Sequence, residues 1–204
     1  MSIKQKKVAL SRKLGMNVVG THRDPLARRK HPPGQHGTNM RRRKSSDYKI
    51  RLLEKQRLRA IYNLKERKFA SYVRESKNKK GSSEQILMRL LESRLDTVAL
   101  KSGFARTQRE SRQLVVHGHF YVNGRKADKP SFACRPGDVI SLKPGSMKKP
   151  FFKEKVSEVI GRGSPRWIIV NQDKWTAKYE RHPEVDEIPI TEELNLGYIM
   201  EYYA

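Results

Sequence analysis

Two arginines, Arg106 and Arg109, lie in or before the first turn of a short predicted helix, where the backbone leaves N–H groups free, and Arg112 follows on the same face as Arg109. Arg106, Arg109 and Arg112 fall within FARTQRESRQLVVHGHF, residues 104–120. Because a helix N-terminus already carries partial positive charge, cations there cost about 0.3–1 kcal/mol each unless an anion neutralises them. Guanidinium groups beside free N–H groups suit a phosphate. The pattern predicts phosphate binding; a solvated helix face is the alternative.

The helix that carries these arginines has clear end signals, and a β-hairpin is predicted directly after it. Thr107 and Glu110 match the T-x-x-E capping box, and Gly118 is expected to end the helix. Residues 120–127, FYVNGRKA, place Asn-Gly between two strand-like arms, the strongest short-range hairpin signal. Residues 130–143 predict a further strand, a Pro-Gly-Asp turn and a β-branched strand. Two helices on a small antiparallel sheet account for this part of the chain.

Positive charge is concentrated in the first part of the chain. The 204 residues include 45 Lys+Arg and 21 Asp+Glu, a formal net charge of +24. The net charge is +20 over residues 1–80, +5 over 81–143 and −1 over 144–204. So uneven a distribution implies a polyanionic partner, either nucleic acid or an anionic membrane. The basic stretch 20–44 is rich in Pro, Gly and His and poor in large apolar residues, which favours nucleic acid over membrane.

Composition and pattern divide the chain into four segments. Residues 1–44 form a basic extension that cannot bury a core alone. Residues 45–93 are predicted to form a helical domain, 94–157 the helix-and-sheet module, and 158–204 a C-terminal segment that packs back on the other domains. The expected fold class is α+β: a mostly helical domain with an inserted small antiparallel-sheet module, preceded by a basic irregular extension.

Periodic apolar residues locate the helices and one late strand. Ser46 or Asp47 is expected to cap the first long helix, and Ser82 with Gln85 forms a capping box for a later one. The run WIIV, residues 167–170, is strand-like. The core face of the first long helix is expected to contain Ile50, Leu53, Ile61 and Leu64.

Metal sites and catalytic sites are not expected. The single cysteine, Cys134, excludes an internal disulfide framework and is expected to be a small buried hydrophobic residue. His22, His31 and His36 lack a fourth ligand and regular spacing, so we expect no metal and no cofactor. The carboxylates are scattered over turns and helix ends without a nucleophile–base pair, which predicts that the protein is not an enzyme and takes no small-molecule substrate.

The motifs R-L-D, G-F-A-x-T, R-Q-L-V-x-H-G-H, V-N-G and P-G-D-V-I occur in this order over residues 94–140. This set resembles the RNA-binding module named after the fourth protein of the small ribosomal subunit. Such modules also occur in RNA-modifying enzymes, tyrosyl-tRNA synthetases and a ribosome-rescue heat-shock protein. The flanks PPGQHG and SDYKIRLLEKQRLRAIY resemble the N-terminal half of the ribosomal protein family itself, and the stretch from WIIV to EYY resembles its C-terminal part.

The resemblance implies a function. Proteins of that family bind the 5′ domain of small-subunit ribosomal RNA early in assembly, contact the fifth small-subunit protein, support decoding accuracy and line the messenger entrance. A cytoplasmic, bacterial-type ribosome is the expected location, an organellar one being possible. Arg41, Arg42, Arg43 and Lys44 match the basic stretch at the messenger entrance only approximately. A free-standing RNA-binding rescue or regulatory factor is the alternative.

The candidate RNA-binding residues are basic or amide side chains on the helices, the hairpin and the extension. In the module they are Arg94, Arg106, Arg109, Arg112, Gln113, His117, Asn123 and Arg125. In the helical domain they are Lys49, Arg51, Lys55, Arg57 and Arg59. In the extension they are Gln35, His36, Arg41, Arg42, Arg43 and Lys44.

Overall fold

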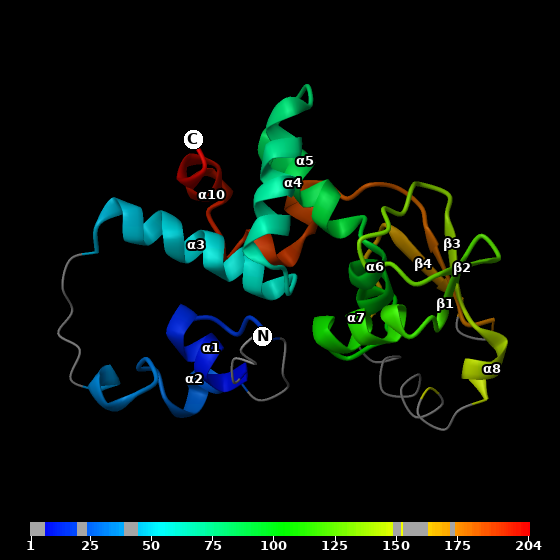
Figure 1. Ribbon diagram of the computed structural model, residues 1–204, viewed down its shortest axis with the longest axis horizontal. Helices are drawn as coiled ribbons and strands as arrows, with labels where there is room; N and C mark the ends of the chain where they lie inside the picture. The colour runs from blue at the N-terminus through cyan, green and yellow to red at the C-terminus, as the bar shows by residue number, and fades with distance from the viewer. Residues whose placement is uncertain (1–6, 20–23, 39–44, 149–151, 153–162, 172–173) are drawn as a thin grey trace. The chain divides into compact units, whose positions relative to one another are not determined.

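The computed structural model describes residues 7–19, 24–38, 45–148, 152, 163–171 and 174–204 (Figure 1). The chain forms two compact units. The first comprises Met1–Arg74 and Pro189–Ala204, and the second comprises Glu75–Ile188. The first unit is therefore built from segments distant in sequence, and the second from one continuous segment.

Helices make up the first unit. They are α1 (Lys7–Leu14), α2 (Pro25–Arg28), α3 (Asp47–Ile61), the first part of α4 (Glu66–Asn78) and α10 (Leu196–Tyr202), with short 3-10 turns at Gln35–Gly37 and Pro189–Thr191. Helix α10 packs against α3. Arg51 Nε donates to Glu201 Oε2 at 2.6 Å, and the Tyr203 hydroxyl donates to Glu66 Oε1 at 2.6 Å. The last helix is thus fixed to residues more than 130 positions earlier.

Helix α3 begins at one of its predicted caps, but its predicted core face is partly wrong. The Ser46 hydroxyl accepts a hydrogen bond from the Lys49 N–H at 3.4 Å. Ile50, expected in the core, is 37% exposed, whereas Leu58 is fully buried. The helical period identifies the apolar face but does not indicate which end of the helix is more deeply buried. Burial is greatest near its C-terminal end, where Leu58 and the following Tyr62 are enclosed.

The N-terminal extension contains more regular structure than its composition indicates. Arg12, on α1, donates from Nε to the His31 carbonyl at 3.0 Å and from Nη2 to the Pro32 carbonyl at 3.1 Å. The same Pro32 carbonyl lies against Gly37, where a Cβ would come within 2.0 Å of its oxygen. Only glycine fits there, so one arginine and one glycine together hold the PPGQHG stretch in shape.

A small sheet with helices forms most of the second unit. Its five antiparallel strands lie in the order β2-β1-β3-β5-β4. The helices are the end of α4, α5 (Ser83–Glu92), α6 (Leu95–Lys101), α7 (Gln108–Val116) and α8 (Pro144–Met147), and the strands are β1 (Phe120–Val122), β2 (Arg125–Ala127), β3 (Val139–Leu142), β4 (Ile168–Asn171) and β5 (Thr176–Tyr179). The α+β class and the late strand at WIIV are confirmed.

One predicted strand is absent from the sheet. Within residues 130–135 only an isolated bridge pairs Ala133 with Arg94. The reason is that the backbone of this stretch forms hydrogen bonds with residues around the start of α6 instead of with a neighbouring strand. The Cys134 N–H donates to the Ser93 carbonyl at 2.7 Å, and the Leu95 N–H donates to the Phe132 carbonyl at 2.9 Å.

The helices and the sheet of the second unit share one apolar core. Phe120 and Ile140 are fully buried on one face of the sheet, and Leu95 and Val115 are fully buried on α6 and α7. The Phe104 ring, between the two helices, lies 5.7 Å from the Phe120 ring. Helices α6 and α7 therefore pack against the Phe120 face, and the start of α7 has a fixed position relative to the β1–β2 hairpin.

Cys134 lies in this core, as predicted, and its thiol should be unreactive while the protein is folded. Its side chain is 1% exposed, and burial raises the pKa of the thiol to about 12. Because the thiolate is the reactive form, a rise of about three units lowers its population about a thousandfold at neutral pH. A thiol-labelling time course should show reaction only in denaturant. Rapid labelling in native buffer would contradict this burial.

Candidate nucleic-acid interface

The start of α7 is capped on both sides by its own residues. The Thr107 hydroxyl accepts from the Glu110 N–H at 3.3 Å, as the capping box predicts. The Glu110 carboxylate accepts from the Arg106 N–H at 2.7 Å, one residue before the cap. Glu110 thus places a negative charge at this helix end and lowers the cost of the nearby arginines. An external phosphate is therefore not required to explain Arg106, although the site can still accept one.

The predicted exposed face of α7 is present. Gln113 and Val116 are exposed, and Arg109 is half-buried. The side chain of Arg112 is 43% exposed, and its Nη1 lies 3.8 Å from Asp96 Oδ2. Leu114 and Val115 enter the core on the other side, as the helical period predicts. Guanidinium and amide groups therefore share one surface of the helix.

Arg94 is a correction to the predicted interface. Its side chain is 2% exposed and is bonded to Asp96, which is fully buried. Nε donates to Oδ1 at 2.9 Å and Nη2 donates to Oδ2 at 2.6 Å, a two-bond pair. Both charged residues of the R-L-D motif are thus held inside the fold. A phosphate would have to displace a buried carboxylate, so we assign Arg94 to folding.

The hairpin turn is formed as predicted, but Asn123 has a different role. Asn123 and Gly124 have φ values of 49° and 77°, as a tight Asn-Gly turn requires. The Asn123 side chain accepts from the Val139 N–H at 2.9 Å and donates to Asp138 at 2.8 Å. These bonds fix the turn to β3. Asn123 is therefore a positioning residue, and the cation that the hairpin presents is the exposed Arg125.

His117 ends α7 on the exposed side of the same region. Its ring lies 6.2 Å from the His119 ring in a stacked arrangement. His119 in turn shares a 2.8 Å hydrogen bond with the Ser146 hydroxyl. Of the pair, His117 is the one open to a ligand, because it is exposed and His119 is half-buried.

The cations of α3 are largely used within the first unit. Lys55 is 3% exposed; its Nζ donates to Glu66 at 2.8 Å and lies 4.3 Å from the centre of the Tyr202 ring. Arg57 binds Glu54 at 2.6 Å. The remaining contacts join Arg57 to the Leu14 carbonyl, Arg59 to Gln56, the Leu64 carbonyl and Glu66, and Arg51 to Glu201.

These contacts revise the predicted contribution of α3. Lys55 cannot reach RNA while buried, which corrects that prediction, and Arg51, Arg57 and Arg59 each have an acceptor inside the protein. Lys49 remains exposed near the helix start. The carboxylates responsible lie at residues 54, 66 and 201, and the last two could not be paired with α3 from sequence.

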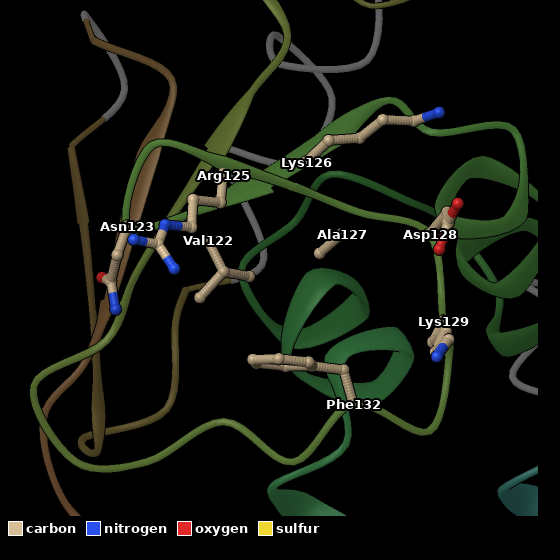
Figure 2. A pocket seen from close by; sticks show the side chains of 8 residues that line it. All are labelled: Val122, Asn123, Arg125, Lys126, Ala127, Asp128, Lys129 and Phe132. Carbon is tan, nitrogen blue, oxygen red and sulfur yellow. The ribbon is translucent and has the colours of Figure 1, made fainter.

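In the extension, Gln35 and His36 are exposed within the Gln35–Gly37 turn. Arg41, Arg42, Arg43 and Lys44 lie outside the described residues, as does His22. Arg12, which bonds to the His31 and Pro32 carbonyls just before this turn, was not predicted from sequence. Lys126, Lys129 and Phe132 were not predicted either; together with Arg125 they line one pocket (Figure 2).

Neither a metal centre nor a membrane-spanning helix is found in the described part of the chain. Among the residues that the structure describes, no group of three or more His, Cys, Asp or Glu side chains is arranged to hold a metal ion. Within the same ranges, no helix combines the length and apolar character needed to cross a membrane.

Known proteins resemble the chain along nearly its whole length. The family model described as "Ribosomal protein S4/S9 N-terminal domain" matches residues 2–92, and the model described as "S4 domain" matches residues 93–140. The protein named "Small ribosomal subunit protein uS4" from Aquifex aeolicus is 41% identical over 201 residues, covering 97% of this chain and 95% of the relative. The proteins of the same name from Persephonella marina and Streptomyces avermitilis are 43% and 40% identical, covering 96% and 97% of this chain and 95% and 96% of the relatives. With this identity and coverage, the chain belongs to the small ribosomal subunit protein uS4 family.

Proposed function

We propose that the protein is a non-catalytic structural component of the small ribosomal subunit and binds small-subunit ribosomal RNA directly. One contrast, between the arginines of α3 and three cations on α7 and the β1–β2 hairpin, carries the proposal. In the first unit, the α3 arginines are bonded to acceptors of the same chain. In the second, Arg109, Arg125 and Lys126 form no ion pair within the described part of the chain. Cations that a fold leaves without carboxylates remain available for an external polyanion.

The binding mode follows from the chemistry of these groups. Structured RNA offers phosphates and 2′-hydroxyls more readily than base edges, because its major groove is deep and narrow. Two planar guanidinium groups and one amide are available for such contacts: those of Arg109 and Gln113 on α7 and of Arg125 on the hairpin. The core fixes the elements that carry them. Arg106, Arg112 and His117 flank them. In the first unit, Lys49, Gln35 and His36 are the exposed candidates among the described residues.

The finer assignment is to the 5′ domain of the RNA. We propose that the protein binds there early in assembly, contacts the fifth small-subunit protein, and supports accuracy at the messenger entrance. Arg41, Arg42, Arg43 and Lys44 are the proposed contacts for messenger or ribosomal RNA. This role needs no cofactor or small-molecule substrate, and its place is the ribosome of the cytoplasm.

Chemical footprinting on separate RNA domains tests the assignment. The protein should protect nucleotides in a transcript of the 5′ domain and leave an equal-length transcript of the 3′ domain unprotected. Cosedimentation then separates a ribosomal component from a free-standing factor. A component stays with small subunits at about one copy per particle through moderate-salt washes, whereas substoichiometric, easily washed binding would favour the factor.

A further inference from the structure

A pocket of about 670 Å³ lies between the β1–β2 hairpin and the loop that follows it (Figure 2). Val122, Ala127 and Phe132 provide apolar lining, and Figure 2 shows their side chains directed toward the space between hairpin and loop. Arg125, Lys126 and Lys129 also line it, with Asp128 as the acidic group. Its size falls within the ~300–1,000 Å³ typical of sites for small ligands.

Phe132 is an exposed aromatic side chain on a firmly held backbone. It is 39% exposed, although large apolar side chains are usually buried. Its N–H donates to the Lys129 carbonyl at 2.9 Å, and its carbonyl accepts from the Leu95 N–H, also at 2.9 Å. The Pro130 carbonyl accepts from the Asp96 N–H at 3.4 Å. The loop is thus bonded to the first turn of α6, so little ordering is needed when a ligand arrives.

The facing wall is fixed as well. The Asn123 side chain bonds to Asp138 and to the Val139 N–H, which holds the hairpin tip against β3. Arg125, the first residue of β2, pairs with Val122 in the antiparallel register, so both side chains point to the same face of the sheet. A cation and an apolar surface therefore lie next to each other on two paired strands that are held in place.

This combination fits a nucleotide better than other partners. A nucleobase has an apolar face that stacks on an aromatic ring, and its phosphate needs a guanidinium or ammonium group nearby. The pocket is lined by three cations and one carboxylate, which favours an anionic ligand over an apolar peptide that has no acidic residues. We propose that the pocket holds one unpaired nucleotide of the bound RNA, its base against Phe132 and its phosphate on Arg125. The proposal rests on the RNA-binding function above and adds a base-stacking subsite to it.

Substitutions at Phe132 test the subsite in the full-length protein with the 5′-domain transcript. Phe132→Ala and Phe132→Leu should each weaken binding about 5- to 150-fold, because both remove a stacking surface. Phe132→Trp should bind about as well as wild type. The leucine variant keeps apolar packing, so a loss shared by both variants but not by tryptophan identifies stacking. Thermal unfolding of each variant, followed in parallel, checks that folding is retained.

Base-specific chemical probing gives the second readout. Wild type should protect one unpaired nucleotide that becomes reactive again with Phe132→Leu while the remaining footprint persists. A photo-crosslinking amino acid at position 132 should join to the same nucleotide, and one at Ile169, 51% exposed on β4, should not. Unchanged affinity with Phe132→Leu, or loss of affinity without a newly reactive nucleotide, overturns the subsite. If wild type itself gives no footprint, the RNA-binding function fails instead.

Discussion

Replacing Asp96 with asparagine should lower the free energy of unfolding of the second unit by about 3–5 kcal/mol. Asparagine keeps the shape of the side chain but removes its charge. The Arg94 guanidinium, 2% exposed, would then lose the charge of the buried carboxylate to which it is bonded. Uncompensated buried charges are among the most destabilising defects in a protein interior. Urea unfolding followed by tryptophan fluorescence is suited to the measurement, because both tryptophans, Trp167 and Trp175, belong to this unit.

Two further variants separate charge burial from general damage. Arg112→Gln removes the longer 3.8 Å interaction of an exposed side chain with Asp96 and should cost at most about 1 kcal/mol. The double change of Arg94→Met and Asp96→Leu removes both buried charges and should be markedly more stable than Asp96→Asn alone. An Asp96→Asn protein within about 1 kcal/mol of wild type would show that the pair is not isolated from water.

Reversing the charge of Arg109 should weaken binding to the 5′-domain RNA about 10- to 100-fold. Arg109→Glu removes a charge-assisted contact with phosphate, which is worth about 1.5–3 kcal/mol, and adds repulsion. For wild type, a protein with about eight phosphate contacts should lose on the order of ten-thousandfold in affinity between 50 and 200 mM salt, since each contact releases counterions. In the variant, the slope of log affinity against log salt should fall by about 1. Filter binding over a salt series measures both effects.

Lys178→Glu is the matched control for net charge. Lys178 is exposed on β5, and the alternation of that strand places it on the sheet face opposite buried Ala177. It should change affinity far less than Arg109→Glu, although both variants alter the charge by two units. An affinity that stays flat with salt, or equal losses in the two variants, would reject phosphate binding by α7.

Local interactions were predictable from sequence because their partners are close along the chain. The caps at Ser46 and Thr107 and the turn at Asn123-Gly124 depend on neighbours within a few residues, and the structure confirms them. The strand expected within residues 130–135 failed for the opposite reason. Its backbone bonds to residues 93 and 95, a pairing that composition and alternation do not encode.

For the candidate site, the sequence indicated correctly which surfaces are basic. It did not indicate which of the cations there remain available to bind a ligand. Arg94 has the residue type of an RNA contact, but the fold buries it with Asp96. Lys55 is bonded to Glu66 and covered by Tyr202, which lies 147 positions away. Such pairings exist only once helices have packed. Phe132 was missed because an aromatic residue in a strand-like pattern predicts core, and its exposure follows from the loop that forms instead.

The division of the first unit across the chain has a consequence for synthesis on the ribosome. Helix α3 needs α10, whose Glu201 and Tyr203 bind Arg51 and Glu66, and the Asn195 N–H donates to Glu54 at 3.2 Å. Roughly 130 residues are translated between the two helices, which takes on the order of 10 s at about 5–20 residues per second. The second unit, being continuous, emerges whole in that interval. All residues of the second unit are therefore synthesised before the first unit has its last helix.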